Sequence, residues 1–341
     1  MTNDLTAAIH TYLTTAPASG FAGQDVRVVD AWRGEDNLLW RVTAGGQEAV
    51  VKLYLDAGQA RGRRQADGQR LFAPPGLAPD PLWFDRYPDG LARQVFVYRW
   101  VTGEAIDVAD DEAMAQMAES AAGIHNSDAG DVRRFCPRPV NLDYFWRVLA
   151  GGIVPVRQWC DALEYLALDS ALQVLGAQAA ALIAEALPLW QTAPPTPVHG
   201  DISLANSLQA GNRIVFVDWE MFGLGDPALE IARFLSDSHS LLAPSVRATW
   251  LARYLEAVQD VDILPRISIY EKLLPLDRLS FLLNGLRTLT DADRNDEAFR
   301  SQADFLADTI LTATVAAGAA LDVDLPFPES ALRSDIERLI S

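Results

Sequence analysis

The first hundred residues alternate apolar and polar positions in short runs that predict an antiparallel sheet. Five runs have the two-residue period or the continuous apolar character of strands: residues 27–32, 38–42, 48–55, 82–84 and 92–100. Residues 34–37 separate the first two runs and Gly45-Gly46 separates the next two, as in hairpins. A short amphipathic helix is expected over residues 4–13. The pattern therefore indicates a sheet built mainly from hairpins.

Helical periodicity takes over after this sheet. One helix is expected over residues 57–72, with Asp56 as its N-cap and Pro74-Pro75-Gly76 as its stop signal. Further helices are expected over residues 110–125, 142–149, 156–168, 172–189, 227–237, 246–258, 265–291, 297–317 and 329–340. Strands followed by helices predict an α+β fold. We place a lobe boundary after residue 101, giving a sheet-bearing lobe (1–101) and a helical lobe (102–341).

Composition narrows the class of protein. The 341 residues are half apolar and carry a formal net charge of −18, so the chain can bury a core but is not suited to non-specific binding of nucleic acid or anionic membranes. The excess acid permits a cationic ligand, although surface acid more often serves solubility alone.

The cysteines and apolar stretches predict a cytoplasmic protein. Cys136 and Cys160 belong to no CxxC or Cys/His cluster and are expected to be ordinary thiols. The N-terminus has no Lys or Arg before Arg27 and no long apolar core, so it is not expected to be a signal peptide. The apolar stretches at 171–190 and 312–321 are interrupted by polar residues or too short to span a bilayer.

Residues 198–231 contain the densest set of chemically useful side chains. His199-Gly200-Asp201 lies in a segment without helical period, so the Asp201 carboxylate can face a cleft and accept a proton from a substrate hydroxyl. Asn206 and Asp218 flank an apolar hairpin and offer the oxygen ligands that Mg²⁺ prefers. We therefore interpret Asp201 as a catalytic base and Asn206 with Asp218 as metal ligands.

The hairpin between Asn206 and Asp218 tests this interpretation. A three-residue loop over 211–213 would pair Ala210 with Ile214 and place Asn206 opposite Asp218 on one face. A two-residue loop would slip the register by one and send the two side chains to opposite faces. We predict the three-residue loop, and the argument for a shared metal depends on it.

His-x-Asp-x-x-x-x-Asn followed by a strand and Asp218 resembles the catalytic loop and metal-binding Asp of kinases. HGD in place of HRD, VDWE in place of DFG, and the later Gly225-Asp226-Pro227 resemble more specifically the aminoglycoside phosphotransferase and choline kinase family. The resemblance is strong over residues 196–235, moderate in the N-terminal third and weak in the last hundred residues. It implies a protein-kinase-like two-lobed fold.

The resemblance also implies a nucleotide site in the sheet-bearing lobe. Lys52 would contact the α- and β-phosphates, although a lysine in a strand could instead mark a sheet edge. Gly34 and Asn37 fill the place of the loop that covers the phosphates, where an ordinary hairpin turn is an equal alternative. The backbone of Arg99-Trp100-Val101 matches the hinge that meets the nucleobase, and it does not distinguish ATP from GTP.

One position departs from the family. Gln65 falls where a carboxylate normally pairs with the lysine, and Asp67 is two residues further on, about 200° round the helix. Either the pair is missing or the helix register differs.

Three residues near the catalytic stretch have modest expected roles. His199 is expected to be structural. Asp226 is expected to cap a helix and to brace the catalytic loop, and Glu220 either helps to bind a second metal or is solvated. His125 is expected to interact only with its own helix terminus.

We interpret the chain as an ATP- or GTP-dependent phosphotransferase that uses Mg²⁺ and moves the γ-phosphate to a hydroxyl of an aminoglycoside, amino alcohol or sugar. The alternatives are a non-catalytic nucleotide-binding module and, less favoured, a protein kinase. Acids after Leu241 are candidates for recognising a cationic acceptor: Glu256, Glu271, Asp277, Asp291 and Asp293. The acceptor, the nucleotide and the oligomeric state stay open.

Overall fold

The computed structural model describes residues 3–34, 36–56, 60–130 and 132–340. Its internal contacts divide the chain into two compact units. The first comprises Met1–Arg138, Thr196–Glu230 and Asp237–Gln259, and the second comprises Pro139–Pro195, Ile231–Ser236 and Asp260–Ser341. The first unit thus combines the sheet with the stretch around Asp201. The lobe boundary after residue 101 stays a prediction.

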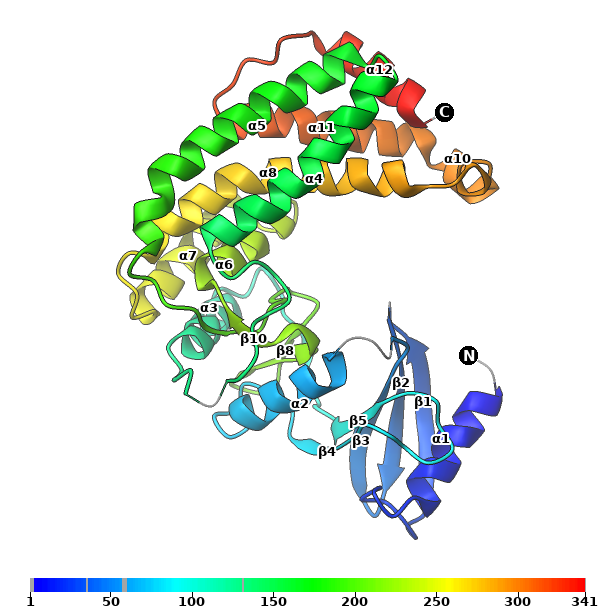
Figure 1. The fold of residues 1–341 in the computed structure, drawn as a ribbon. Helices are drawn as coiled ribbons and strands as arrows, with labels where there is room; N and C mark the ends of the chain where they lie inside the picture. The colour runs from blue at the N-terminus through cyan, green and yellow to red at the C-terminus, as the bar shows by residue number, and fades with distance from the viewer. Residues whose placement is uncertain (1–2, 35, 57–59, 131, 341) are drawn as a thin grey trace. The chain divides into compact units, whose positions relative to one another are not determined.

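A five-stranded antiparallel sheet forms most of the N-terminal region, as the alternation predicts (Figure 1). Its strands are β1 (Val26–Arg33), β2 (Asn37–Ala44), β3 (Gln47–Tyr54), β4 (Pro81–Asp85) and β5 (Val95–Arg99). The order across the sheet is β1-β2-β3-β5-β4, so β3 is a central strand with a neighbour on each side.

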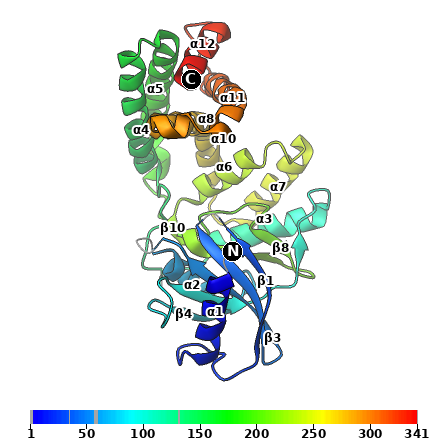
Figure 2. The same ribbon diagram turned by 90° about the vertical axis from the view of Figure 1, so that its right-hand side faces the viewer.

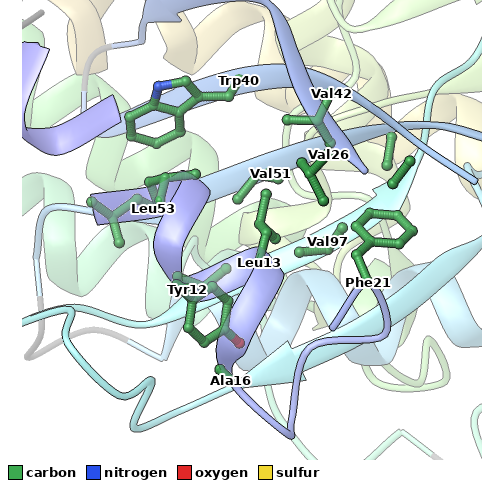
Figure 3. Close-up of a cluster of buried hydrophobic side chains, with 14 of the residues drawn as sticks. Tyr12, Leu13, Ala16, Phe21, Val26, Trp40, Val42, Val51, Leu53 and Val97 are labelled. Atoms are coloured by element: carbon green, nitrogen blue, oxygen red, sulfur yellow. The ribbon is translucent and has the colours of Figure 1, made fainter. Parts of the chain in front are cut away.

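One face of this sheet packs against α1 (Asn3–Thr15). Leu13 and Tyr12 from the helix meet Val51 and Leu53 from β3 and Trp40 from β2, all buried (Figure 3). Because side chains alternate along a strand, Lys52 between these two β3 residues must point to the opposite face.

The opposite face packs against α2 (Arg61–Phe72), through Ala66 against Val50, Tyr54 and Phe96. The prediction that Asp56 caps this helix is wrong, because Ala60 occupies the N-cap position and no side chain caps it. Arg61 in the first turn forms ion pairs with two carboxylates of other segments, so tertiary contacts hold the helix start instead. Residues 57–59 of the predicted helix lie outside the described residues.

The rest of the first unit is built from helices and short strands. α3 (Asp111–His125) begins at the N-cap Asp110, and it packs against α7 (Pro244–Ala257) (Figure 2). The predicted hairpin forms β8 (Ser207–Gln209) and β9 (Ile214–Phe216). Sequence analysis missed strands β6 (Glu104–Ala105), β7 (Thr196–Val198) and β10 (Gly223–Gly225), since two or three residues are too short to show a period.

α6 (Pro227–Asp237) has the bounds predicted for it, and it begins in the first unit. The second unit is helical. The helices of the second unit are α4 (Leu142–Ala162), α5 (Leu166–Ala186), α8 (Ile263–Thr288), α9 (Asp291–Arg294), α10 (Glu297–Ser301), α11 (Ala303–Ala320) and α12 (Glu329–Ile340). The predicted break between residues 149 and 156 is wrong, since α4 continues through Pro155. Pro155 removes one backbone hydrogen bond from the helix, and the buried side chains of Ile153 and Val156 on either side of it keep this stretch packed in the unit. The predicted helix over 297–317 is two helices that meet at Gln302.

Two segments, Leu166–Trp190 and Ala303–Ala320, are apolar and long enough to cross a membrane by length and composition alone. Helices in the core of a soluble protein pass the same test, and both pack against other helices of their unit. The cytoplasmic location stays a prediction. Cys136 and Cys160 are buried free thiols, as predicted.

The packing of α2 on the segment after Asp218 generates a stability prediction. A Cβ at Gly68 would lie 2.9 Å from ring atoms of Trp219 and Phe222. Gly68→Ala should therefore lower the free energy of unfolding by about 1–3 kcal/mol, despite the better helix propensity of alanine. Gly123→Ala in α3 is the matched control, because its Cβ would meet only Leu77 at 3.7 Å. It should be neutral or stabilising in the same urea titration, and equal effects of both changes would contradict this packing.

Candidate functional site

A cavity of about 430 Å³ in the first unit brings most of the predicted site together. Its lining includes the predicted residues Gly34, Asn37, Lys52, Trp100, Val101, Asp201, Asn206 and Asp218. Glu220, Arg61 and Asp36 add charge to the lining, and Trp32 and Tyr98 add aromatic surface. The predicted residues Gln65, Arg99, His199 and Asp226 are not part of the lining.

Lys52 is the cation at the centre of this cavity. Its side chain is almost fully buried, and its Nζ lies 2.6 Å from Asp218 Oδ1 and 3.0 Å from Glu220 Oε2. Arg61 reinforces the cluster, donating to Glu220 Oε1 at 2.7 Å and pairing with Asp36 at 2.9 Å. Because β3 is a central strand, the edge interpretation of Lys52 is wrong and the buried ion pair is what the structure has.

The carboxylate that pairs with Lys52 comes from an unexpected segment. Gln65 is buried, but its Oε1 accepts a hydrogen bond from the Tyr54 hydroxyl at 2.6 Å. Asp67 pairs with arginines instead, among them Arg134 at 2.7 Å. Glu220 therefore takes the place of the missing partner, and the solvated interpretation of Glu220 is wrong because only 9% of it is exposed.

The pKa values of the buried phenols Tyr54 and Tyr98 respond to the negative charges at this cavity. Burial raises the pKa of both phenols, and the negative charges of Asp218 and Glu220 raise it further. Three carboxylates, of Asp36, Asp218 and Glu220, face the two cations Lys52 and Arg61, so this cluster keeps an excess negative charge that a further cation can satisfy.

The predicted register of the hairpin is wrong. Ala210 N donates to Arg213 O at 2.9 Å, so the loop has two residues, and Val217 N donates to Asn206 O at 2.8 Å. Asn206 therefore faces Val217 rather than Asp218. The first residue of the loop is a glycine with φ of +65°, which a two-residue turn accepts and a side chain would strain.

Asn206 and Asp218 nevertheless line the same cavity. Asp218 lies just beyond β9 in the left-handed conformation, with φ of 65° and ψ of 55°. That conformation breaks the alternation of the strand and redirects the side chain, so the face argument does not extend to Asp218. Our sequence argument for a shared metal fails, and the convergence rests on this one strained residue instead.

Asp201 is held from two sides. Its Oδ1 accepts from Arg138 Nη2 at 2.7 Å and its Oδ2 accepts from Asn206 Nδ2 at 2.9 Å. Arg138 Nε also donates to the carbonyl of Gly200, so one guanidinium holds both the backbone and the carboxylate of the loop. Asp201 keeps 45% of its side chain exposed. Sequence analysis missed Arg138, which precedes α4 by a few residues and carries no local signal.

The side chain of Asn206 donates two hydrogen bonds through its nitrogen Nδ2, one to Asp201 Oδ2 and one to the Asp201 carbonyl. The amide oxygen is then the atom left to face a metal. Asp218, Asn206 and the nearby Glu220 form a set of hard oxygen donors, which fits Mg²⁺ held partly by substrate phosphates. Among the described residues no group of three or more His, Cys, Asp or Glu could hold a metal by itself.

A buried network supports the loop from behind. His199 Nε2 donates to the Val217 carbonyl at 2.9 Å, and burial lowers the pKa of His199, so the ring is neutral and structural. Glu230 accepts from the amides of His199 and Gly200 and lies 2.8 Å from His125 Nε2. The interpretation of His125 as a helix-terminus charge is therefore incomplete, because its ring is buried in this network.

Asp226 caps α6, accepting from the amide of Ala228 at 3.0 Å, as predicted. Glu230, one turn further along the helix, contacts the loop that carries Asp201 through the amides of His199 and Gly200. The bracing role predicted for Asp226 therefore stays a prediction, and Glu230 was missed because a glutamate inside a helix looks like a surface residue in the sequence.

Two of the three residues of the predicted hinge, Arg99-Trp100-Val101, line the cavity. Trp100 and Val101 line the cavity, whereas Arg99 is exposed and its guanidinium lies near Asp80 at 3.5 Å. The amide of Trp100 donates to the Glu48 carbonyl at 3.0 Å, which fixes the hinge against β3. Trp32 meets Trp100 edge to face at 6.4 Å and extends the aromatic surface.

The turn before β2 closes as a hairpin, with Gly34 N donating to Asn37 O at 3.0 Å. Both residues also line the cavity, so the hairpin and phosphate-loop interpretations are compatible. Glu35 lies outside the described residues.

The acids proposed for a cationic acceptor are not in the cavity lining. Asp277 pairs with Arg233 at 2.9 Å and Glu256 with Arg253 at 3.2 Å. Asp293 accepts from Thr290, and the side chain of Asp291 lies outside the described part. A role for these acids stays a prediction.

Comparisons with known proteins agree with this geometry. A sequence model of the phosphotransferase enzyme family matches residues 28–270. A comparison with curated proteins found no significant match.

Solved structures confirm the kinase-like fold predicted from the resemblance. A thermostable mutant of aminoglycoside phosphotransferase APH(4)-Ia, in ternary complex with AMP-PNP and hygromycin B, is 19% identical, covers 87% of this chain and 94% of its own, and has a TM-score of 0.56. A choline/ethanolamine kinase family protein from Mesorhizobium loti is 18% identical, with 98% and 99% coverage and a TM-score of 0.56. Choline kinase LicA from Streptococcus pneumoniae is 14% identical, with 87% and 93% coverage and a TM-score of 0.54.

The buried network generates a pH-dependent prediction. Burial alone would raise the pKa of Glu230, but the hydrogen bonds from His125 and the loop amide outweigh it and hold that pKa below 4.5. Its contribution to stability is thus present above pH 4.5 and is lost as the pH falls through the lower folded-state pKa. Glu230→Gln should lower the free energy of unfolding by ~3 kcal/mol at pH 7, with a smaller difference in acid.

Urea unfolding of both proteins at pH 7 and pH 4 measures this change. Glu119→Gln, at an exposed position of α3, is the control and should stay within about 0.5 kcal/mol of the wild type. A Glu230→Gln loss that is the same at both pH values would show that the charge of Glu230 is not what stabilises the loop.

Proposed function

Because this chain belongs to the phosphotransferase enzyme family, we propose that it is a small-molecule kinase that moves the γ-phosphate of ATP or GTP to a hydroxyl of an aminoglycoside, amino alcohol or sugar. The observation that carries the proposal is the convergence of Lys52, Asp201, Asn206 and Asp218 on one cavity. These are a phosphate-binding cation, a base and two oxygen ligands, and phosphoryl transfer needs little more than their correct placement.

Lys52 steadies the phosphates of the nucleotide. Its two carboxylate partners hold the ammonium in place within a buried strand, so little side-chain entropy is lost when the phosphates arrive. Asn206 and Asp218 would hold Mg²⁺ through their free oxygens. That ion would neutralise charge on the transferring phosphate. The cavity surface formed by Trp32, Trp100 and Val101 is the place for the base of the nucleotide.

Asp201 orients the acceptor hydroxyl and takes its proton. Arg138 and Asn206 fix both carboxylate oxygens, while the remaining exposure of the side chain leaves room for a substrate. A hydroxyl held by a fixed carboxylate is close to its attacking geometry before reaction, which is a large part of the catalysis.

The alternative of a non-catalytic nucleotide-binding module loses its main support. Gln65 favoured it by removing the usual partner of the lysine, and Glu220 supplies that partner from another segment. A cytoplasmic location, a cationic acceptor and the absence of nucleic-acid and membrane partners are further parts of the proposal, and they rest on composition.

The central experiment is a nucleotide-consumption screen over aminoglycosides, amino alcohols and sugars with magnesium. Asp201→Asn should lower kcat for any acceptor found by about 10²–10⁴-fold, because it removes the base and keeps the shape. Asp25→Asn, an exposed carboxylate of the same unit, should leave kcat unchanged. An Asp201→Asn protein as active as the wild type would show that Asp201 is not the base. No magnesium-dependent thermal shift with either nucleotide would reject the function itself.

Arg138→Gln tests how Asp201 is held. Losing the guanidinium frees one carboxylate oxygen and the Gly200 carbonyl, so kcat should fall by roughly 10–100-fold through misplacement of the base. The thermal shift with magnesium and nucleotide should stay as in the wild type, because Arg138 does not line the cavity. Arg27→Gln, at an exposed pair, is the control. A loss of nucleotide binding with normal kcat would contradict the positioning role.

A further inference from the structure

A second cavity of about 390 Å³ lies in the first unit and shares no residue with the first. Its lining is Arg63, Arg64, Asp67, Arg70, Leu71, Val132, Arg133, Arg134, Phe222 and Gly223. Among the described residues, five arginines and one carboxylate line it, although acidic residues outnumber basic ones by 46 to 28 in the whole chain. The charge balance of this cavity is therefore the reverse of the balance in the protein.

The sequence of α2 explains how the arginines gather. Positions 63, 67 and 70 repeat at helical spacing and lie on one face of the helix. Arg61 lines the first cavity instead, so α2 presents cations to both cavities. Arg133 and Arg134 come from the segment after α3, and Arg134 joins Asp67 at 2.7 Å. Two segments distant in sequence thus bring their positive charges to one place.

The single carboxylate does not balance these charges. Asp67 lies 3.1 Å from Arg63, 2.7 Å from Arg134 and 3.5 Å from Arg70, so three guanidinium groups share one negative charge. Arginine stays protonated in proteins, so the described residues of the lining carry four more positive than negative charges. Such a surplus is a site of positive potential that attracts anions.

The walls of the cavity are held firmly. Arg64 donates to the carbonyls of Phe135 and Phe222, the latter at 3.1 Å, and so ties α2 to two other segments. A Cβ at Gly223 would lie 2.4 Å from the amide nitrogen of Cys136, so the floor is packed directly on neighbouring backbone. The cavity is thus formed before any ligand arrives, which lowers the entropy lost on binding.

We propose that this cavity binds a small, multiply charged phosphate compound, at a site separate from the nucleotide cavity. Guanidinium groups match phosphate oxygens in paired hydrogen bonds, and several of them around one concave space favour a polyphosphate over a single carboxylate. The volume suits a chain of two or three phosphates rather than a macromolecule.

Isothermal titration with inorganic tripolyphosphate, without magnesium and at low salt, tests the proposal. Lys52→Met removes the phosphate contact of the first cavity and should leave this binding in place. Should that variant not fold, the wild-type protein is titrated instead, and the binding assigned to the second cavity is the part that the arginine variant described next should lose. Arg133→Gln combined with Arg134→Gln should weaken binding by about tenfold or more, because charge-assisted hydrogen bonds are lost. Arg27→Gln is the control and should change nothing.

Asp67→Asn separates binding from structure. It removes the negative charge that the described lining carries at Asp67, so tripolyphosphate should bind more tightly than to the wild type, whereas damage to the fold would weaken it. Pyrophosphate and a sugar phosphate, titrated in parallel, show which length of ligand the cavity prefers. Weaker binding in Asp67→Asn, or binding lost in Lys52→Met and kept in the double arginine variant, would overturn the proposal.

Discussion

The buried ammonium of Lys52 is the constraint on which the first unit depends. An unpaired charge inside a protein is very unfavourable, so a lysine on a central strand requires carboxylates beside it. Asp218 and Glu220 meet that requirement from a segment 166 residues further along the chain. The pairing joins the sheet to the hairpin segment and keeps them in one compact unit. The ammonium that we propose to bind phosphate thus also holds the two segments together.

The backbone around the carboxylates is under a different constraint. Asp218 adopts a left-handed conformation, and Gly200 has a φ of +89° with the Met221 carbonyl 2.5 Å from where a Cβ would be. A glycine adopts positive φ without strain, whereas the left-handed conformation of Asp218 persists only when surrounding contacts outweigh its strain. The Lys52 pair supplies that support at Asp218, and Glu230 holds the loop at Gly200 through its amide. Support from buried charge therefore makes the strained site geometry stable.

Periodicity predicted most strands and helices, and the motifs together with the family resemblance predicted eight of the residues that line the cavity. Three features of the site could not be predicted from the sequence, each for a physical reason. Gly-Asn turns suit two- and three-residue loops alike, so the hairpin register was wrong. Arg138 and Glu230 act on the loop from other elements, and no local pattern marks a long-range contact. Gln65 showed that the usual lysine partner was missing, but only the fold reveals that Glu220 replaces it.

Helix α2 separates two electrostatic environments of opposite character. On one side Arg61 meets the carboxylates of the first cavity, and on the other side arginines outnumber Asp67, the acid among the described residues of the second cavity. The helix can approach both neighbours because Gly62 faces Phe84 and Tyr54 of the sheet while Gly68 faces Trp219 and Phe222. Larger residues at these two positions would move the helix outward and separate Arg61 from Glu220. Two glycines thus keep the cations of α2 within reach of their partners, and the order of residues in one helix links packing to charge in both cavities.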